Sequence, residues 1–196
     1  MVPGAAAEVA LEALADRGLV GDPQVRHRGT IGGSLAHGDP ASDLPAAVLA
    51  LGGTLVAQGP SGTRTIAASD FFLGFLETAL APDEVLIEIR LPKMQGAGWS
   101  FQKFNRRAQD WAIVGVAAVG AGAGGGIALV NMASTPVRAT AAERAVAGGA
   151  SPSDAAAVAA EGLQPPADLN ASAEFRRHLA TVLTRRALEE VAAGRP

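Results

Sequence analysis

Glycine and proline divide the first two thirds of this chain into short segments, and this division limits the folds that the chain can adopt. The main breaks are Pro23, Gly32-Gly33, Gly52-Gly53, Pro92 and the run "GAGAGG" at residues 120–125. Prolines and paired glycines interrupt helices, so only short helices and strands fit between the breaks. The chain has 196 residues, of which 48% are hydrophobic, and this is enough to build a packed core.

Short helices and strands alternate in the prediction for the first 92 residues. One helix covers about residues 5–17, and another begins at Ser42 or Asp43 with Pro45 in its first turn, where a missing N–H costs nothing. The β-prone runs "TLVAQ" and "TRTI" flank "GPSG" and predict a hairpin. The stretch "SDFFLGFLETAL" predicts a helix that starts at Ser69-Asp70. The alternation in "EVLIEIRLP" predicts a strand with one face formed by Val85, Ile87, Ile89 and Leu91.

The polar, glycine-rich "KMQGAG" that follows Pro92 predicts a linker. We place a domain boundary there, which divides residues 1–95 from residues 96–196. The second part begins with three strand-like runs, "WSFQKFNRR", "AIVGVAAVGA" and "GIALVNMAS".

Three helices are predicted after these strands, starting at Thr140, at about Pro152 and at about Ala171. Thr140 and Glu143 have the spacing of a capping box. In the last helix an apolar stripe leaves Arg176 outside. An antiparallel sheet covered by helices on one face is an α+β arrangement.

Charge and composition exclude several classes of function. The 16 Lys and Arg residues are outnumbered by 19 Asp and Glu residues, so we expect no binding to nucleic acid or to an anionic membrane surface. No run of eighteen apolar residues is present, which predicts a cytoplasmic protein without membrane insertion. The chain has no cysteine and therefore no disulfide, thiolate zinc site or cysteine-ligated iron–sulfur cluster of its own. His27 and His37 lack the spacing of a metal site, and no metal is predicted.

Two glycine-rich motifs compete as cofactor sites. "GAGAGG" has the spacing of a dinucleotide fingerprint, but that motif needs a helix directly after it, and the β-prone "GIALVNMAS" follows instead. We interpret it as a hairpin turn. In "GTIGGS", residues 29–34, the adjacent glycines allow consecutive N–H groups to form a concave nest for a diphosphate. Asp43 could accept hydrogen bonds from the hydroxyls of a ribose or ribityl chain. A glycine turn followed by a helix cap explains the same residues and stays open as the alternative.

Three stretches in this order resemble a known family: "DPQVRHRGTIGGSLAHGDPASDLPAAVLAL", "DFFLGFLETALAPDEVLIEIRLP" and "FQKFNRRAQDWAIVGVAA". They are similar to the FAD-binding medium subunit of the molybdenum hydroxylases, the group that includes carbon monoxide dehydrogenase and xanthine dehydrogenase. The resemblance implies part of a vanillyl-alcohol-oxidase-type FAD-binding domain. A small three-stranded antiparallel sheet with a helical bundle would follow it.

The resemblance also implies which residues bind the cofactor. The loop Thr30, Ile31, Gly32, Gly33 and Ser34 would contact the diphosphate and ribityl region of FAD. Asp43 would contact the cofactor, Leu86 would pack near it, and Lys103 would lie close to the flavin. Asp110 and Trp111 of "RRAQDWA" are carried over as structural residues only, which would fix the strand or an interface. No catalytic acid or base is predicted, and we do not expect the chain to be active alone.

Members of the family usually begin with a further region that carries a second glycine motif, A-G-G-H-S, and nothing before Val20 resembles it. We therefore expect FAD binding to be weakened, because affinity depends on a nearly complete enclosure. The implied function is an electron-transfer subunit that takes electrons from iron–sulfur clusters and passes them to an external acceptor. The molybdenum cofactor and the [2Fe-2S] clusters would belong to a large and a small partner subunit in a hetero-oligomer. The alternative is a cofactor-free, truncated paralogue that acts as a structural or interaction module.

Overall fold

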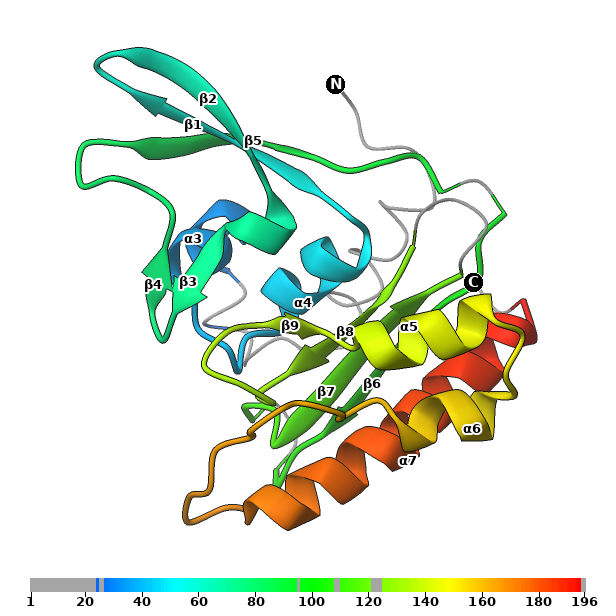
Figure 1. Ribbon diagram of the computed structural model, residues 1–196. Coiled ribbons are helices and arrows are strands. Elements are labelled where there is room, and N and C mark those ends of the chain that lie inside the picture. The colour runs from blue at the N-terminus through cyan, green and yellow to red at the C-terminus, as the bar shows by residue number, and fades with distance from the viewer. Residues whose placement is uncertain (1–23, 25–26, 95, 108–109, 121–124, 195–196) are drawn as a thin grey trace.

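The computed structural model describes residues 24, 27–94, 96–107, 110–120 and 125–194, so the helix predicted at residues 5–17 lies outside the described residues. Figure 1 shows the fold. Its elements are α3 (Ile31–His37), α4 (Asp43–Ala50), β1 (Thr54–Gly59), β2 (Gly62–Ala67), the short 3-10 helix η1 (Ala68–Asp70), β3 (Phe72–Gly74), β4 (Glu77–Thr78), β5 (Val85–Arg90), β6 (Trp99–Phe104), β7 (Val114–Val119), β8 (Ile127–Val130), β9 (Val137–Arg138), α5 (Thr140–Ala147), α6 (Pro152–Ala157) and α7 (Ala173–Ala192). Within the described part of the chain, no helix has both the length and the apolar character to cross a membrane.

The first sheet has the order β2-β1-β5 and is antiparallel throughout, which confirms the predicted hairpin. The turn between β1 and β2 uses Gly62 at a φ of 117°, a conformation that L side chains rarely adopt. The predicted face of β5 is wrong. The register against β1 skips Ile87, and this bulge leaves Val85 and Ile87 exposed while Leu86 and Ile89 pack against the core.

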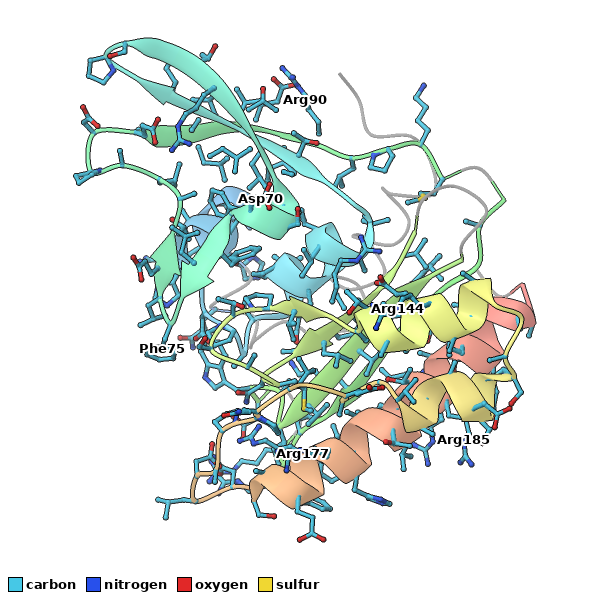
Figure 2. All side chains as sticks on the ribbon, viewed as in Figure 1. Asp70, Phe75, Arg90, Arg144, Arg177 and Arg185 are labelled. Carbon is cyan, nitrogen blue, oxygen red and sulfur yellow. The ribbon has the colours of Figure 1, made fainter. Side chains whose placement is uncertain are left out.

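The helix predicted from "SDFFLGFLETAL" is also wrong, because η1 is followed by the two-stranded hairpin β3–β4. Phe71 and Phe72 are buried, but Phe75 lies exposed at the hairpin tip, as Figure 2 shows. Leu76 turns the chain with a φ of 57°. The aromatic and apolar residues in this stretch follow neither helical nor strand periodicity over its whole length, and the backbone bond from Ala79 N–H to Phe71 O closes the hairpin instead.

The second sheet has the order β6-β7-β8-β9, so a short fourth strand adds to the three that were predicted. Successive residues of β7 alternate between two cores: Val116 and Ala118 face one apolar cluster and Ala117 faces the other. Both faces of this sheet are therefore covered, which explains why "AIVGVAAVGA" is apolar along its whole length. The segment 120–125 connects the antiparallel strands β7 and β8, and the helix that a dinucleotide fingerprint requires is replaced by β8.

The three C-terminal helices cover one face of this sheet, and α4 lies on the other (Figure 1). The capping box predicted at Thr140 is not formed: Ala139 is the N-cap residue, and Glu143 accepts hydrogen bonds from Ile127 N–H and Arg138 Nε at 2.8 Å. Glu143 thus joins α5 to the sheet rather than capping its own helix.

Arg176, predicted on the outside of the last helix, is 1% exposed. Its guanidinium donates to Asp168 Oδ2 at 2.7 Å and to the carbonyl oxygen of Ile113. The buried charge is tolerated because both terminal nitrogens of the guanidinium have acceptors, whereas Nε is buried without a partner among the described residues. Arg176 thus joins α7 to the start of β7.

The core on the α4 side is shared between the two halves of the chain. Ala46, Ala47 and Ala50 of α4 belong to the same buried cluster as Leu55 of β1 and Phe101 of β6. The small side chains of α4 allow the helix to lie close to the sheet β6–β9, so α4 holds the first sheet against the second.

Candidate functional site

The motif "GTIGGS" forms the start of a helix rather than a loop. Thr30 is the N-cap of α3: its Oγ1 accepts the N–H of Gly33 at 3.0 Å, and its carbonyl accepts the N–H of Ser34 at 3.0 Å. The first turn of α3 takes the place of the predicted nest, because the hydroxyl of Thr30 caps a helix that begins at Ile31. The first amides of a helix have no acceptor within it, and those of Ile31 and Gly32 occupy that position here.

Gly32 and Gly33 differ in what the fold requires of them. Both have ordinary backbone angles, so neither is needed for a left-handed conformation. A Cβ added to Gly33 would meet Oγ1 of Thr30 at 3.0 Å, and the cap therefore accounts for that glycine. A Cβ added to Gly32 would have nothing within 4 Å. Glycine in a helix costs up to about 1 kcal/mol relative to alanine, and the described chain gives no reason for it at Gly32.

Asp43 and Lys103 form a buried ion pair, although they are 60 residues apart in sequence. Nζ of Lys103 donates to Oδ2 of Asp43 at 2.8 Å, and the two side chains are 3% and 5% exposed. Asp43 is the first residue of α4, where its charge is favourable at a helix N-terminus. Lys103 lies on β6, and the pair joins α4 to the second sheet.

The second carboxylate oxygen of Asp43, Oδ1, is buried and has no hydrogen-bond partner among the described residues. Burial raises the pKa of this carboxyl, and the ammonium and hydrogen bond of Lys103 offset part of that rise. Asp43 therefore presents a desolvated acceptor that a hydroxyl donor would satisfy.

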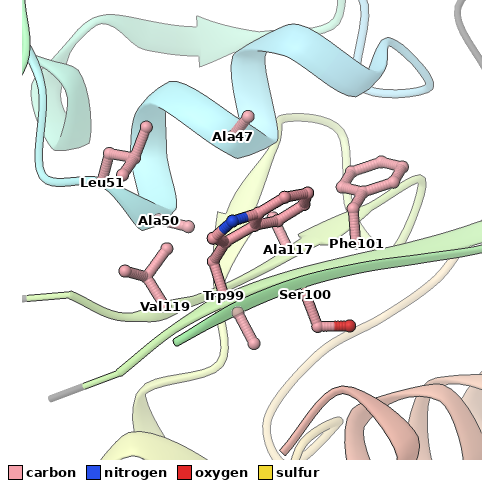
Figure 3. Close-up of a pocket in the computed structure, with 9 residues that line it drawn as sticks. Ala47, Ala50, Leu51, Trp99, Ser100, Phe101, Ala117 and Val119 are labelled. Carbon is pink, nitrogen blue, oxygen red and sulfur yellow. The ribbon is translucent and has the colours of Figure 1, made fainter. Parts of the chain in front are cut away.

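Apolar packing sets the distance between α4 and β6. Figure 3 shows Trp99 and Phe101 of β6 beneath Ala47 and Ala50 of α4. These four residues line a cavity of about 20 Å³. Lys103 follows Trp99 and Phe101 at a spacing of two, so all three face α4. The aromatic residues carry the contact, and the lysine places its ammonium at the helix start.

Leu86 lies on β5, which packs against α3, and belongs to the partly buried residues around the same core as Leu35 of α3. The structure thus brings together Thr30, Gly33 and Ser34 by hydrogen bonds, and Asp43 with Lys103 by the ion pair. α3 packs against both β5 and α4 and joins these groups.

The "RRAQDWA" segment links β6 to β7, and Ala108 and Gln109 within it lie outside the described residues. Oδ1 of Asp110 accepts the N–H of Trp111 at 2.9 Å, while the Trp111 side chain is 60% exposed. Asp110 thus shapes a local turn, and Trp111 does not anchor the strand. In the described part of the chain, no group of three or more His, Cys, Asp or Glu side chains could hold a metal ion.

Sequence reasoning missed two contacts around α4. It placed Asp43 and Lys103 separately but did not pair them, and it did not single out Asn131, whose N–H donates to Pro40 O at 2.8 Å. No local sequence pattern predicts a contact between residues so far apart in the sequence. A charged residue within the apolar strand "WSFQKF" was the one available signal for Lys103.

Comparison with known families covers nearly the whole chain. Residues 6–94 match the FAD binding domain in molybdopterin dehydrogenase, and residues 99–191 match the CO dehydrogenase flavoprotein C-terminal domain. The carbon monoxide dehydrogenase medium chain of Hydrogenophaga pseudoflava is 40% identical over 180 residues, which cover 87% of this chain and 63% of that relative. The nicotine 6-hydroxylase medium subunit of Paenarthrobacter nicotinovorans is 37% identical over 200 residues, covering 97% of this chain and 70% of the relative.

Solved structures give the same result. A chain of the Hydrogenophaga pseudoflava carbon monoxide dehydrogenase that lacks the Mo-pyranopterin moiety superposes with a TM-score of 0.84 at 42% identity, over 92% of this chain and 66% of that one. Quinoline 2-oxidoreductase from Pseudomonas putida 86 superposes with a TM-score of 0.81 at 29% identity, over 96% and 69% of the two chains. The chain spans a little under two thirds of the carbon monoxide dehydrogenase medium chains that it matches. With its cofactor-binding segment, its C-terminal domain and its fold all matched, the chain belongs to the FAD-binding medium subunits of the molybdenum hydroxylase family.

Proposed function

We propose that this chain is the flavin-binding, electron-transfer subunit of a cytoplasmic molybdenum-containing hydroxylase or dehydrogenase. Residues 1–95 would form part of the FAD-binding domain and residues 96–196 the C-terminal domain. A large molybdenum subunit would oxidise the substrate, and a small subunit would carry the iron–sulfur clusters. Family membership supports this division of roles, and so does the absence of cysteine from the sequence, since cluster ligation by cysteine must then come from a partner.

The residues of the site fit a flavin nucleotide. The amides at the start of α3 and the hydroxyl of Ser34 would donate to the diphosphate, because a helix start carries positive potential and unpaired N–H groups. Oδ1 of Asp43 would accept from a sugar or ribityl hydroxyl, and Leu86 would contact an apolar part of the cofactor. Lys103 would hold Asp43 ionised and in place. FAD, when bound, would supply the redox chemistry, and this chain would supply position and electrostatics.

The observation that carries the proposal is the open space beside Gly32, in the segment matched by the FAD-binding family. A helical glycine that no described neighbour requires indicates that something outside the fold approaches the backbone closely. Gly33 is a poorer test position, since a side chain there would meet the Thr30 cap as well as any ligand.

The test compares Gly32→Leu with Ala36→Leu. Both substitutions place a leucine side chain on α3, but Ala36 lies exposed near the other end of the helix. FAD is titrated into each purified chain and followed by flavin fluorescence. We expect Gly32→Leu to weaken FAD binding at least tenfold and Ala36→Leu to leave it unchanged. A wild-type chain that takes up no FAD, or a Gly32→Leu variant that binds as the wild type does, would overturn the proposal.

Nothing in the described part of the chain specifically favours the alternative, a cofactor-free interaction module. The same titration separates the two functions, because a folded chain without affinity for FAD is the result that the alternative requires.

A further inference from the structure

Asn131 joins three segments at the contact between α4 and the second sheet. It directly follows β8. Its backbone N–H donates to the carbonyl oxygen of Pro40 at 2.8 Å, and Nδ2 of its side chain donates to the carbonyl oxygen of Ala112 at 2.8 Å. Pro40 belongs to the turn between α3 and α4, and Ala112 ends the "RRAQDWA" segment before β7.

The backbone of Asn131 is left-handed, with a φ of 59°. Non-glycine residues in this region cost free energy, and asparagine is among the few that adopt it with little penalty. The conformation aims the N–H at Pro40 while the side chain reaches Ala112. A left-handed residue held by two hydrogen bonds to different segments indicates a position that the fold specifies closely.

The turn that Asn131 holds is otherwise satisfied within itself. Gly38 has a φ of 67°, Oδ1 of Asp39 accepts Ala41 N–H at 2.8 Å, and Asp39 O accepts Ser42 N–H at 3.0 Å. None of these bonds reaches the second sheet, so they fix the shape of the turn and not its place. Among the described hydrogen bonds, those of Asn131 and of the Asp43–Lys103 pair link residues 38–43 to that sheet.

The row of paired residues Lys103, Gly115 and Val130 crosses β6, β7 and β8, and Asn131 comes directly after it. The ion pair holds Asp43 at the Lys103 end of this row, and the hydrogen bond from Asn131 holds Pro40 at the Val130 end. Asn131 contacts neither Asp43 nor α3 by a described hydrogen bond, and it would act through Pro40.

We propose that Asn131 is a positioning residue. Its side-chain bond to Ala112 fixes its left-handed backbone, which holds Pro40 and thereby sets the end of α3 and Asp43 against the sheet that carries Lys103. The effect on flavin rests on the function proposed above, whereas the effect on the turn does not.

Three variants separate the parts of this link. Asn131→Gly keeps the left-handed backbone and the N–H but loses the amide, whereas Asn131→Ala loses the amide and disfavours the backbone conformation. Asn131→Asp keeps the size but replaces the donor by an acceptor facing Ala112 O. Leu183→Ala is the control, because it opens the core on the other face of the sheet without touching either link.

The first measurement is hydrogen exchange of residues 38–43 in the chain without added flavin. We expect exchange there to rise about tenfold in Asn131→Ala and Asn131→Asp, less in Asn131→Gly, and not in Leu183→Ala. The second measurement is the affinity for FAD and the midpoint potential of the bound flavin, both of which should shift in the same order across the variants. A general loss of stability would not reproduce that order.

Unchanged exchange of residues 38–43 in all three Asn131 variants would overturn the inference. An equal change in Leu183→Ala would also overturn it, since stability alone would then explain the effect. If the wild type binds no FAD while the Asn131 variants still loosen the turn, the positioning role stands and the flavin function fails.

Discussion

Replacement of Lys103 by methionine tests the buried ion pair most directly. The substitution keeps much of the side-chain volume but removes the ammonium that lies 2.8 Å from Oδ2 of Asp43. In wild type, attraction at this distance is about 6 kcal/mol at an effective dielectric constant of about 20. The desolvation of two nearly buried charges is of similar size, so the net contribution of the intact pair is small.

The cost of breaking the pair is large because one charge remains buried. In Lys103→Met, the carboxylate of Asp43 would stay buried but would lose its cation; the Asp43 side chain is 5% exposed in wild type. The carboxylate can escape by taking up a proton, which at pH 7 costs about 4 kcal/mol for an ordinary pKa of about 3.9. We therefore expect a loss of about 3–4 kcal/mol in the free energy of unfolding, a large part of the 5–15 kcal/mol typical of a whole domain.

Urea unfolding of wild type, Lys103→Met, Asp43→Asn and the double variant measures the coupling. Lys103→Met should lose about 3–4 kcal/mol, whereas the double variant, in which no carboxylate is left buried without its cation, should lose less than about 2 kcal/mol. The dependence of stability on pH gives a second test. Burial raises the pKa of Asp43 above its unfolded value, so its contribution is favourable below the unfolded pKa and is lost as pH rises through the folded pKa. Removal of Lys103 strengthens this dependence, and the deficit of Lys103→Met should shrink toward pH 4.

Two results would refute this reasoning. A Lys103→Met variant that loses less than about 1 kcal/mol at pH 7 would mean that Asp43 is solvated or otherwise compensated. Additive losses in the double variant would mean that the two residues act independently.

Three further predictions concern stability. Arg64 and the backbone N–H of Ala81 lower the pKa of Glu84 to about 2. The contribution of Glu84 to stability is therefore present above its ordinary pKa and is lost as pH falls through about 2. Unfolding measured between about pH 2 and 7 should show that Glu84→Gln is less stable than wild type, with a difference that disappears at the acid end. Arg176→Met should cost about 2 kcal/mol in urea unfolding, because the Ile113 carbonyl loses its donor, and a change below about 0.5 kcal/mol would contradict the role assigned to Arg176. Gly32→Ala should raise the free energy of unfolding by up to about 1 kcal/mol while weakening FAD binding, and a thermal melt beside a titration checks whether the two effects have opposite signs.

The local elements were predictable where one pattern dominated. The hairpin at 54–67 follows from β-prone runs around "GPSG", and α4 follows from Pro45 in its first turn and the glycines after it. Strand β5 was predicted in the right place but with the wrong face, because a bulge at Ile87 reverses the alternation. A bulge depends on the partner strand, and the sequence of β5 alone does not contain it.

Contacts between distant segments were not predictable. Glu143 has the spacing of a capping box, yet it binds Ile127 and Arg138 on the sheet. Arg176 stands beside Arg177 in the sequence, but Arg176 is buried, whereas Arg177, which is labelled in Figure 2, is exposed. In both cases a charged side chain finds its partner through the tertiary fold, which outweighs the local preference.

Three features of the site depart from local rules, and they lie along one connected stretch. Gly32 weakens a helix, Asp43 keeps an unpaired oxygen in a buried place, and Asn131 holds a left-handed backbone against the turn between them. A fold selected for stability alone would replace Gly32 by alanine and the Asp43–Lys103 pair by two apolar residues. Departures from local rules that gather at one place are typical of functional sites, where a ligand provides the missing contacts. A ligand that covers Gly32 and donates to Asp43 Oδ1 would provide both at once, and this is why we assign the cofactor to α3 and the start of α4 rather than to the glycine-rich connection between β7 and β8.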